Sequence, residues 1–305
     1  EPVYGNNMNQ PRFGKVGNAY MLFYQRVSSM EAAQEIYRPS ERGTPVQVQL
    51  PRDLGNHIAM ENELFIRTYC LQDPYHASFV RYLLGLSRDQ AIAEAPNASE
   101  LQKSAVYVAL DTLDQLISRS REMPELDRLL TEFGRAIHDT PDGAEHVLEW
   151  VADRDTGLRN LILKPLQQPV RAVSMKILLM ALAKLQERAI DSDADEAESQ
   201  EWLAKFSRGY REVASSMEKL WSILPTVSRS WDDYFEFLSR LTRFQVPVVD
   251  VLLEHGFLLR CLEILWLDRE DSKKLKRQYA LYYRNVERGR KYSHRNLMEF
   301  LASLL

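Results

Sequence analysis

The spacing of apolar residues predicts that most of this chain is helical. From Asp53 onward, apolar positions recur every three to four residues, as on a helix with one buried face. Residues 170–190 are apolar along one whole side, so we expect this helix to lie at the centre of the domain. The pattern gives about ten or eleven helices joined by short connections. Those expected after residue 200 cover 202–224, 231–244, 246–267, 271–287 and 293–304.

Capping signals predict where several helices begin. Asp73 is followed by a proline, which is an N-cap and a first helical residue, and the helix that follows carries Phe79 and Val80 on its apolar side. Ser99, with Gln102 three residues later, has the pattern of a capping box. Thr140 and the proline after it are expected to open another helix.

An acidic run interrupts the series of helices. Residues 191–201 contain six acidic side chains and no basic one. Because like charges repel and remain solvated, we expect a loop here. Such a loop suggests a division of the helical domain, residues 53–305, into halves 53–190 and 202–305.

The arrangement of these helices favours a repeat architecture. No strict period is present, but helix pairs of roughly 40 residues are typical of degenerate HEAT or armadillo units. The segment VDVLLEHGFLLRCLEILW, residues 249–266, has the same character. We therefore predict an all-α, α-solenoid-like array, with a compact helical bundle as the alternative.

The first part of the chain is different. Residues 19–24, AYMLFY, form a strand-like run that is apolar on both faces, and such a strand belongs in the middle of a covered sheet. Residues 46–50 are the only other strand candidate, so we expect the sheet to be missing from this chain. Residues 38–53 hold three prolines and one glycine, which predicts an extended linker over about residues 28–52.

Composition excludes several classes of protein. The 305 residues are 45% hydrophobic with a net charge of -4, which indicates a globular chain with no general attraction for nucleic acid or anionic lipid. Neither a secretory leader nor an 18-residue apolar run is present, so we expect an intracellular protein. Cys70 and Cys261 lie in apolar helical patterns, where a buried, unreactive thiol in a reducing compartment is expected.

The sequence offers no pattern typical of an enzyme. The histidines are dispersed without metal-binding spacing, and the phosphate-binding glycine motifs do not occur. We therefore predict no catalytic residue, no metal site and no cofactor. The six histidines are His57, His76, His138, His146, His255 and His294.

One basic segment allows two interpretations. Residues 273–295 combine lysines and arginines with interleaved tyrosines, a composition that can contact phosphates and stack on bases. We favour a solvated helix face whose tyrosines pack inward. The basic residues are Lys273, Lys274, Lys276, Arg277, Arg284, Arg288, Arg290, Lys291 and Arg295, and the tyrosines are Tyr279, Tyr282, Tyr283 and Tyr292.

Residues 18–26, NAYMLFYQR, resemble the closing strand of the catalytic domain of ubiquitin-specific proteases, the cysteine deubiquitinases. The segment LPRDLGNHIAMENELF, residues 50–65, is similar to the helix-opening segment that follows this domain in very large, fungal members. Those members continue into a helical-repeat extension. The resemblance implies that residues 1–27 are the last part of a protease domain and that 53–305 are the extension.

The family's cysteine box, and its histidine box with paired glycines, are absent from this sequence. The chain alone is therefore expected to be inactive, while the resemblance implies that the parent protein hydrolyses isopeptide bonds at the ubiquitin C-terminus. The helical part would recruit ubiquitinated substrates or adaptors, or brace the catalytic domain, in the cytoplasm or nucleus. The alternatives are a free-standing helical-repeat scaffold and, less favoured, a nucleic-acid-binding helical domain.

Overall fold

The computed structural model describes residues 51–66, 74–119, 125–191, 196–244, 248–265, 279–280, 284 and 294–305. Within these ranges every regular element is a helix, which confirms the predicted all-α class. The expected strand at 19–24, Cys70 and most of the basic segment 273–295 lie outside the described residues.

The chain divides into two compact units, Glu1–Met60 and Glu61–Leu305. Helix α2 (Arg52–Phe65) crosses this division, and it begins where the sequence predicts a helix. None of its residues is buried. The other helices in the described ranges belong to the second unit.

The α-helices of the second unit follow one another along the chain, and residues 266–294, between the last two, are described only in part. They are α3 (Pro74–Leu86), α4 (Gln90–Ala93), α5 (Ala98–Gln115), α6 (Leu126–Asp139), α7 (Gly143–Asp153), α8 (Gln168–Ile190), α9 (Glu196–Leu220), α10 (Trp231–Leu241), α11 (Val249–Glu254), α12 (Phe257–Leu265) and α15 (Arg295–Leu304). Shorter turns are η2 (Ile117–Arg119), the π-helical η3 (Arg159–Leu163), η4 (Leu224–Thr226) and η5 (Ser228–Ser230).

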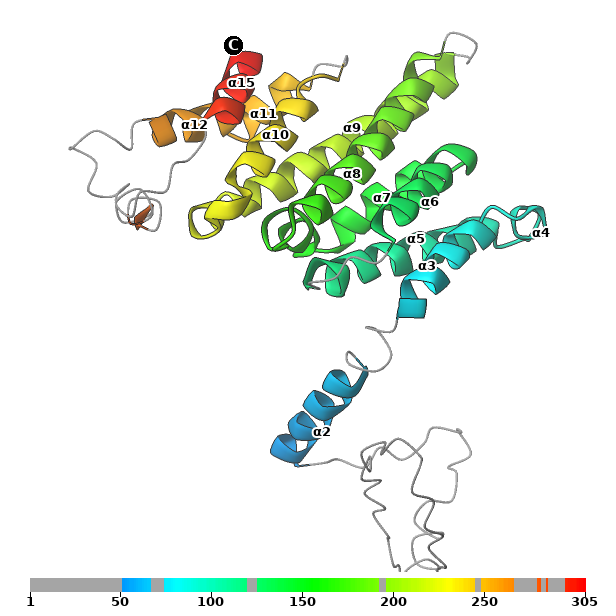
Figure 1. Cartoon of the computed structure of the whole chain (residues 1–305). Helices are drawn as coiled ribbons and strands as arrows, with labels where there is room; N and C mark the ends of the chain where they lie inside the picture. Colours follow the sequence, from blue (N-terminus) through cyan, green and yellow to red (C-terminus); the bar gives the residue numbers. More distant parts are fainter. Residues whose placement is uncertain are drawn as a thin grey trace, which may run out of the picture. The chain divides into compact units, whose positions relative to one another are not determined.

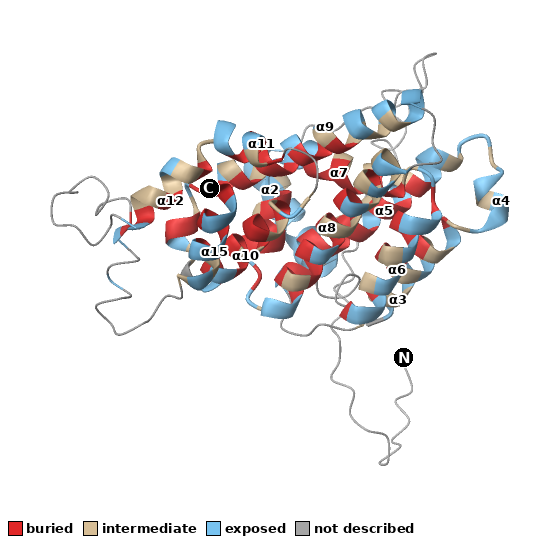
Figure 2. Cartoon of the chain, turned by 90° about the horizontal axis from the view of Figure 1, so that it is seen from above, coloured by how far each residue is buried: buried red, intermediate tan, exposed pale blue. Residues whose placement is uncertain are grey.

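These helices form two layers, which lie side by side in Figure 2. Figure 1 shows how the helices follow one another along the array. One layer contains α5, α7, α9 and α11, and each helix packs on the next. The other contains α3, α6, α8, α10 and α15 in the same way. Because consecutive helices alternate between the layers, the second unit is an α-solenoid-like array.

Helix α8 occupies the centre of the array, as the sequence predicts. It packs against α6, α7, α9 and α10, and its buried residues lie on several sides of the helix. The hydrophobic core is continuous from Val80 on α3 to Leu304 on α15.

The predicted capping box at Ser99 is wrong. Helix α5 begins at Ala98, so Ser99 lies inside the first turn, and the residue before the helix, Asn97, makes no side-chain capping bond. Gln102 is buried and donates a hydrogen bond to the Ser87 carbonyl at 3.2 Å. The Gln102 side chain, which the local pattern assigned to the helix cap, makes a tertiary contact instead.

The helix start predicted at Thr140 is also wrong. Thr140 ends α6, where its hydroxyl donates to the Ala136 carbonyl at 2.6 Å, and α7 begins three residues later at Gly143. A Cβ on Gly143 would lie 2.1 Å from the Ala136 carbonyl oxygen, so only glycine fits this turn. The predicted apolar face of the next helix is confirmed, because Val147 and Trp150 are buried.

Part of the acidic run that was expected to be a loop is helical. Residues 196–201 are helical and form the beginning of α9, with Glu196 and Glu198 in its first turn. Acidic side chains are favourable there because the amino end of a helix carries a partial positive charge. The helix predicted over 246–267 is divided at Gly256, whose φ of 71° ends α11 before α12 begins.

A buried ion pair joins α8 to α10. The Arg171 guanidinium donates to the Asp233 carboxylate at 2.8 Å and to the Pro165 carbonyl at 2.7 Å. Gln168 donates a longer bond to the same carboxylate, at 3.4 Å. Both charged side chains are almost fully buried, so each depends on the other for compensation.

We expect Arg171→Met to lower the free energy of unfolding by about 3–5 kcal/mol, because it leaves the Asp233 charge buried without its partner. The double variant Arg171→Met/Asp233→Leu should recover much of this loss, since it removes both charges and leaves mainly the Pro165 carbonyl without a donor. Urea unfolding of Arg171→Met, Asp233→Leu and the double variant measures the coupling energy between the two side chains. Additive losses in the double variant would contradict the assignment of a mutually dependent pair.

A glycine allows α7 and α9 to pack closely. A Cβ on Gly209 of α9 would lie 2.5 Å from Cδ1 of the buried Leu148 on α7. By contrast, a Cβ on Gly134 in α6 would meet only the Met180 sulfur, at an ordinary 3.8 Å. The two glycines lie inside helices, so they differ mainly in the space beside them.

We expect Gly209→Ala to destabilise the protein, because overpacking costs about 1–3 kcal/mol and the gain in helix propensity is at most about 1 kcal/mol. The matched variant Gly134→Ala should stabilise it by about 0.5–1 kcal/mol. Thermal and urea unfolding of both variants checks the sign of each change. Equal effects on stability at the two sites would show that Leu148 does not prevent a Cβ at position 209.

Candidate functional site

Helix α3 carries an exposed apolar surface opposite its buried face. Val80 and Leu84 are fully buried in the core. On the other side of the helix, four large side chains follow a spacing of four, three and four residues, and we call this surface the α3 stripe. It consists of Tyr75, Phe79, Tyr82 and Leu86, which are 80%, 56%, 63% and 37% exposed.

A helix that is apolar on both faces is normally covered on both faces. Helix α3 packs on α5 and α6 through its buried face. Its neighbour α6 also packs on α8, and α8 also packs on α10. Within the described array, α3 is therefore the terminal helix of its layer, and the α3 stripe forms the outer side of that end.

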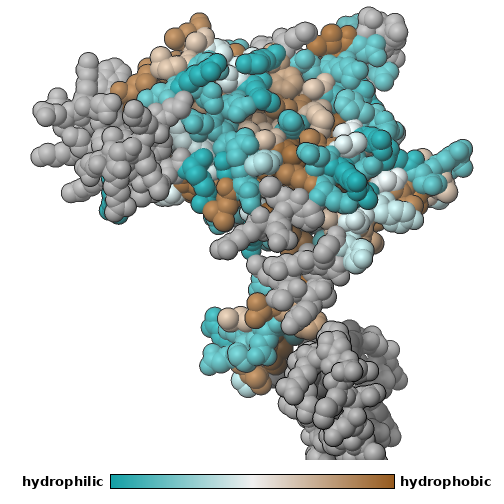
Figure 3. Space-filling view, viewed as in Figure 1, coloured by the Kyte–Doolittle hydropathy of each residue, from teal (hydrophilic) through white to brown (hydrophobic). Residues whose placement is uncertain are grey.

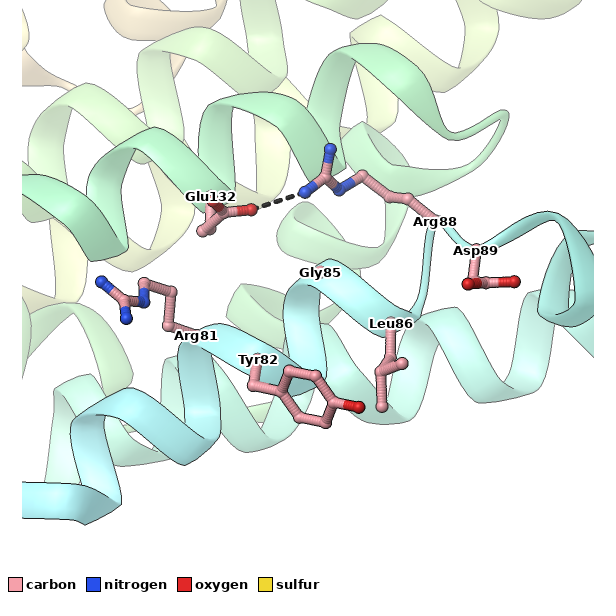
Figure 4. Close-up of a pocket in the computed structure, with 7 residues that line it drawn as sticks. All are labelled: Arg81, Tyr82, Gly85, Leu86, Arg88, Asp89 and Glu132. Carbon is pink, nitrogen blue, oxygen red and sulfur yellow. Dashed lines mark hydrogen bonds and ion pairs between the residues drawn. The ribbon is translucent and has the colours of Figure 1, made fainter.

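A groove of about 440 Å³ lies beside the α3 stripe (Figure 4). Tyr82 and Leu86 leave α3 on the same side of the helix. The space beside Gly85 is empty. A Cβ built on this residue would meet only a guanidinium nitrogen of Arg88, at 3.9 Å. The lining residues are Arg81, Tyr82, Gly85, Leu86, Arg88, Asp89 and Glu132.

The two arginines that line the groove are both paired. Arg88 bridges α3 and α6 through Glu132 at 2.5 Å and Asp139 at 3.2 Å. Arg81 makes an ion pair with Glu125 at 3.1 Å. The rim is thus nearly neutral and held in place by bonds between the two helices, while the adjoining apolar side chains remain exposed.

In the other layer, polar pairs link α5 to α7 at the surface. Lys103 contacts Glu149 at 3.0 Å, and the Tyr107 hydroxyl donates to Asp153 at 2.7 Å. Burial, with the hydrogen bond to Asp153, raises the pKa of the Tyr107 phenol, and the hydrogen bond to Glu149 raises the pKa of Lys103 despite desolvation. Figure 3 shows hydrophilic side chains over much of the visible face of the array, with apolar patches between them.

One constellation has the order of a catalytic triad. The Ser99 hydroxyl lies 3.4 Å from His146 Nε2, and His146 Nδ1 lies 3.3 Å from the Glu149 carboxylate. The Ser99 hydroxyl donates a shorter bond to Asp142, at 3.0 Å, and Glu149 is paired with Lys103. Because the hydroxyl proton and the orienting carboxylate both have closer partners, the arrangement fits a structural link between α5 and α7.

The other predicted chemistry-bearing residues are scattered. His57 and His138 are exposed, and His255 contacts the Glu218 carboxylate at 2.6 Å, an interaction that lowers the pKa of Glu218. His76 lies near Thr112, and His294 lies beside the Trp231 ring. In the described part of the chain, no three metal-ligating side chains come together.

Cys261 is buried, as the sequence predicts, and burial raises the pKa of its thiol to about 12. Such a thiol is unreactive near neutral pH.

Part of the basic segment is described. Tyr279 is buried and accepts a hydrogen bond from the Trp221 indole at 3.1 Å, while Arg295 pairs with Glu299 at 2.9 Å. At Tyr279 the side chain packs inward, as the solvated-face interpretation expects. A stacking role for this tyrosine is excluded by its burial.

The α3 stripe was not identified by the sequence reasoning, which placed Phe79 on the same apolar side as Val80. In the structure Val80 is buried in the core and Phe79 belongs to the exposed series. The available signal was the four-three-four spacing of Tyr75, Phe79, Tyr82 and Leu86 beside a second apolar series.

Comparisons with known proteins give one match. A family model described as a domain of unknown function (DUF3517) matches residues 155–305, which include α8 to α15. No curated protein and no solved structure matches the chain. In the described residues, no helix has the length and apolarity needed to cross a membrane. The α3 stripe lies outside the matched region.

Proposed function

We propose that this chain is the non-catalytic C-terminal helical region of a ubiquitin-specific protease and that the α3 stripe is its protein-binding surface. The observation that carries the first part is the nine-residue segment 18–26, which resembles the closing strand of that protease domain. The helical array after this segment is what the resemblance implies. The parent protein would remove ubiquitin from substrates by thiol-dependent isopeptide hydrolysis.

The properties of the described residues support a binding role. Cys261 is buried with a raised pKa, and the Ser99 hydroxyl is bonded to Asp142 in preference to His146. The α3 stripe instead offers apolar area beside a groove with a fixed rim. Apolar and aromatic side chains of this kind dominate the energetics of protein interfaces.

Two roles fit this surface. In recruitment, the α3 stripe binds an adaptor or a ubiquitinated substrate. In bracing, it supports the catalytic domain of the same protein. A free-standing scaffold would use the same stripe, so the reading frame upstream of Glu1 separates it from the protease assignment: a cysteine box and a histidine box in that frame support the protease, and their absence contradicts it.

In the longer protein, we expect Phe79→Glu/Tyr82→Glu to lower the turnover of ubiquitinated proteins at least tenfold if the stripe recruits, because two buried charges in an apolar interface cost several kcal/mol. Hydrolysis of a small ubiquitin C-terminal amide reporter should stay within about twofold, since the reporter needs no recruitment. A parallel loss with the reporter would indicate bracing.

The matched control is Leu259→Glu, which adds a charge at a side chain 65% exposed on α12, away from the α3 stripe. It should leave both rates unchanged. Unchanged rates in the Phe79→Glu/Tyr82→Glu variant as well would refute a role for the α3 stripe.

A further inference from the structure

We propose that the α3 stripe pairs with the α3 stripe of a second copy of this chain, with the two helices antiparallel. This inference rests on the proposed function only in taking the α3 stripe as a protein-binding surface. It names the partner of that surface.

The spacing of the α3 stripe is self-complementary. The intervals of four, three and four residues read the same in both directions, with the midpoint between residues 80 and 81. An antiparallel two-fold pairing about this midpoint places Phe79 opposite Tyr82 of the second copy and Tyr75 opposite Leu86 of the second copy. Each copy uses the same patch, as an isologous two-fold interface requires.

The groove beside the stripe has room for a side chain of the second copy. Leu86 and Gly85 line the groove, and Gly85 adds no side chain to it. Tyr75, the most exposed residue of the stripe, is brought opposite Leu86 by the antiparallel register. The ring of Tyr75 from the second copy would therefore enter a groove of about 440 Å³.

The charges around the stripe permit this pairing. Arg81 is bonded to Glu125, and Arg88 is bonded to Glu132 and Asp139. A rim of one sign would repel its own copy, whereas this rim is neutralised by its internal pairs. Closing the two stripes together therefore brings no block of unpaired like charge into contact.

The available area predicts a weak dimer. With about 200 Å² for each aromatic side chain, the exposed fractions of Tyr75, Phe79 and Tyr82 correspond to about 400 Å² in each copy. The whole interface then buries about 800–1,000 Å², which is below the 1,200–2,000 Å² of stable complexes. We expect a dissociation constant of about 10–100 μM.

Sedimentation velocity on the full 305-residue chain tests the proposal. Over about 1–200 μM, the chain should change from monomer to dimer, Tyr82→Glu should raise the dissociation constant at least tenfold, and Leu259→Glu should leave it unchanged. Monomer at every concentration, or a dimer insensitive to Tyr82→Glu, overturns the proposal.

Cysteine cross-linking tests the register. Tyr75→Cys/Leu86→Cys should give a covalent dimer on mild oxidation, because the antiparallel register brings these positions together. Tyr75→Cys alone should not, because two copies of residue 75 would lie about 16 Å apart along the helices. Cross-linking by Tyr75→Cys alone overturns the antiparallel arrangement.

Failure of this inference differs from failure of the proposed function. A chain that stays monomeric, while Tyr82→Glu still lowers turnover of ubiquitinated proteins in the longer protein, rejects the second copy and retains the protein-binding surface.

Discussion

The wide buried face of α8 determines the architecture of the array. Its buried residues extend over more than one side of the helix, so a single neighbour cannot remove this apolar surface from water. Four helices, α6, α7, α9 and α10, supply the cover, and they lie in both layers. The one charge in its buried set, Arg171, is tolerated because Asp233 on α10 accepts its hydrogen bond. The polar contact thus selects which helix can occupy that side.

The same physical rule applied to α3 gives a different outcome. Helix α3 also has two apolar faces, but one of them remains exposed at the end of the described array. Repeat arrays normally end in a helix with a polar outer face, since an apolar end attracts another surface. The α3 stripe instead places aromatic side chains on this outer face.

Sequence reasoning succeeds where a property is local. The period of residues 170–190 predicts the central helix, and the apolar surroundings of Cys261 predict its burial. It fails where a tertiary partner competes with a local motif. Gln102 bonds to the Ser87 carbonyl instead of capping α5. The acidic residues 196–201 become helical because the end of a helix stabilises charges that would otherwise favour a loop.

The α3 stripe was missed for a related reason. A single apolar face is the simplest interpretation of Phe79 and Val80, because neighbouring residues on a helix are only about 100° apart. The distinction needs Tyr75, one turn before Phe79, and Tyr82 and Leu86 after it, which extend the second series at the same spacing. In the described residues, packing within the array covers one of the two series. The equal spacing of the second series in both directions makes an identical face a suitable partner for it.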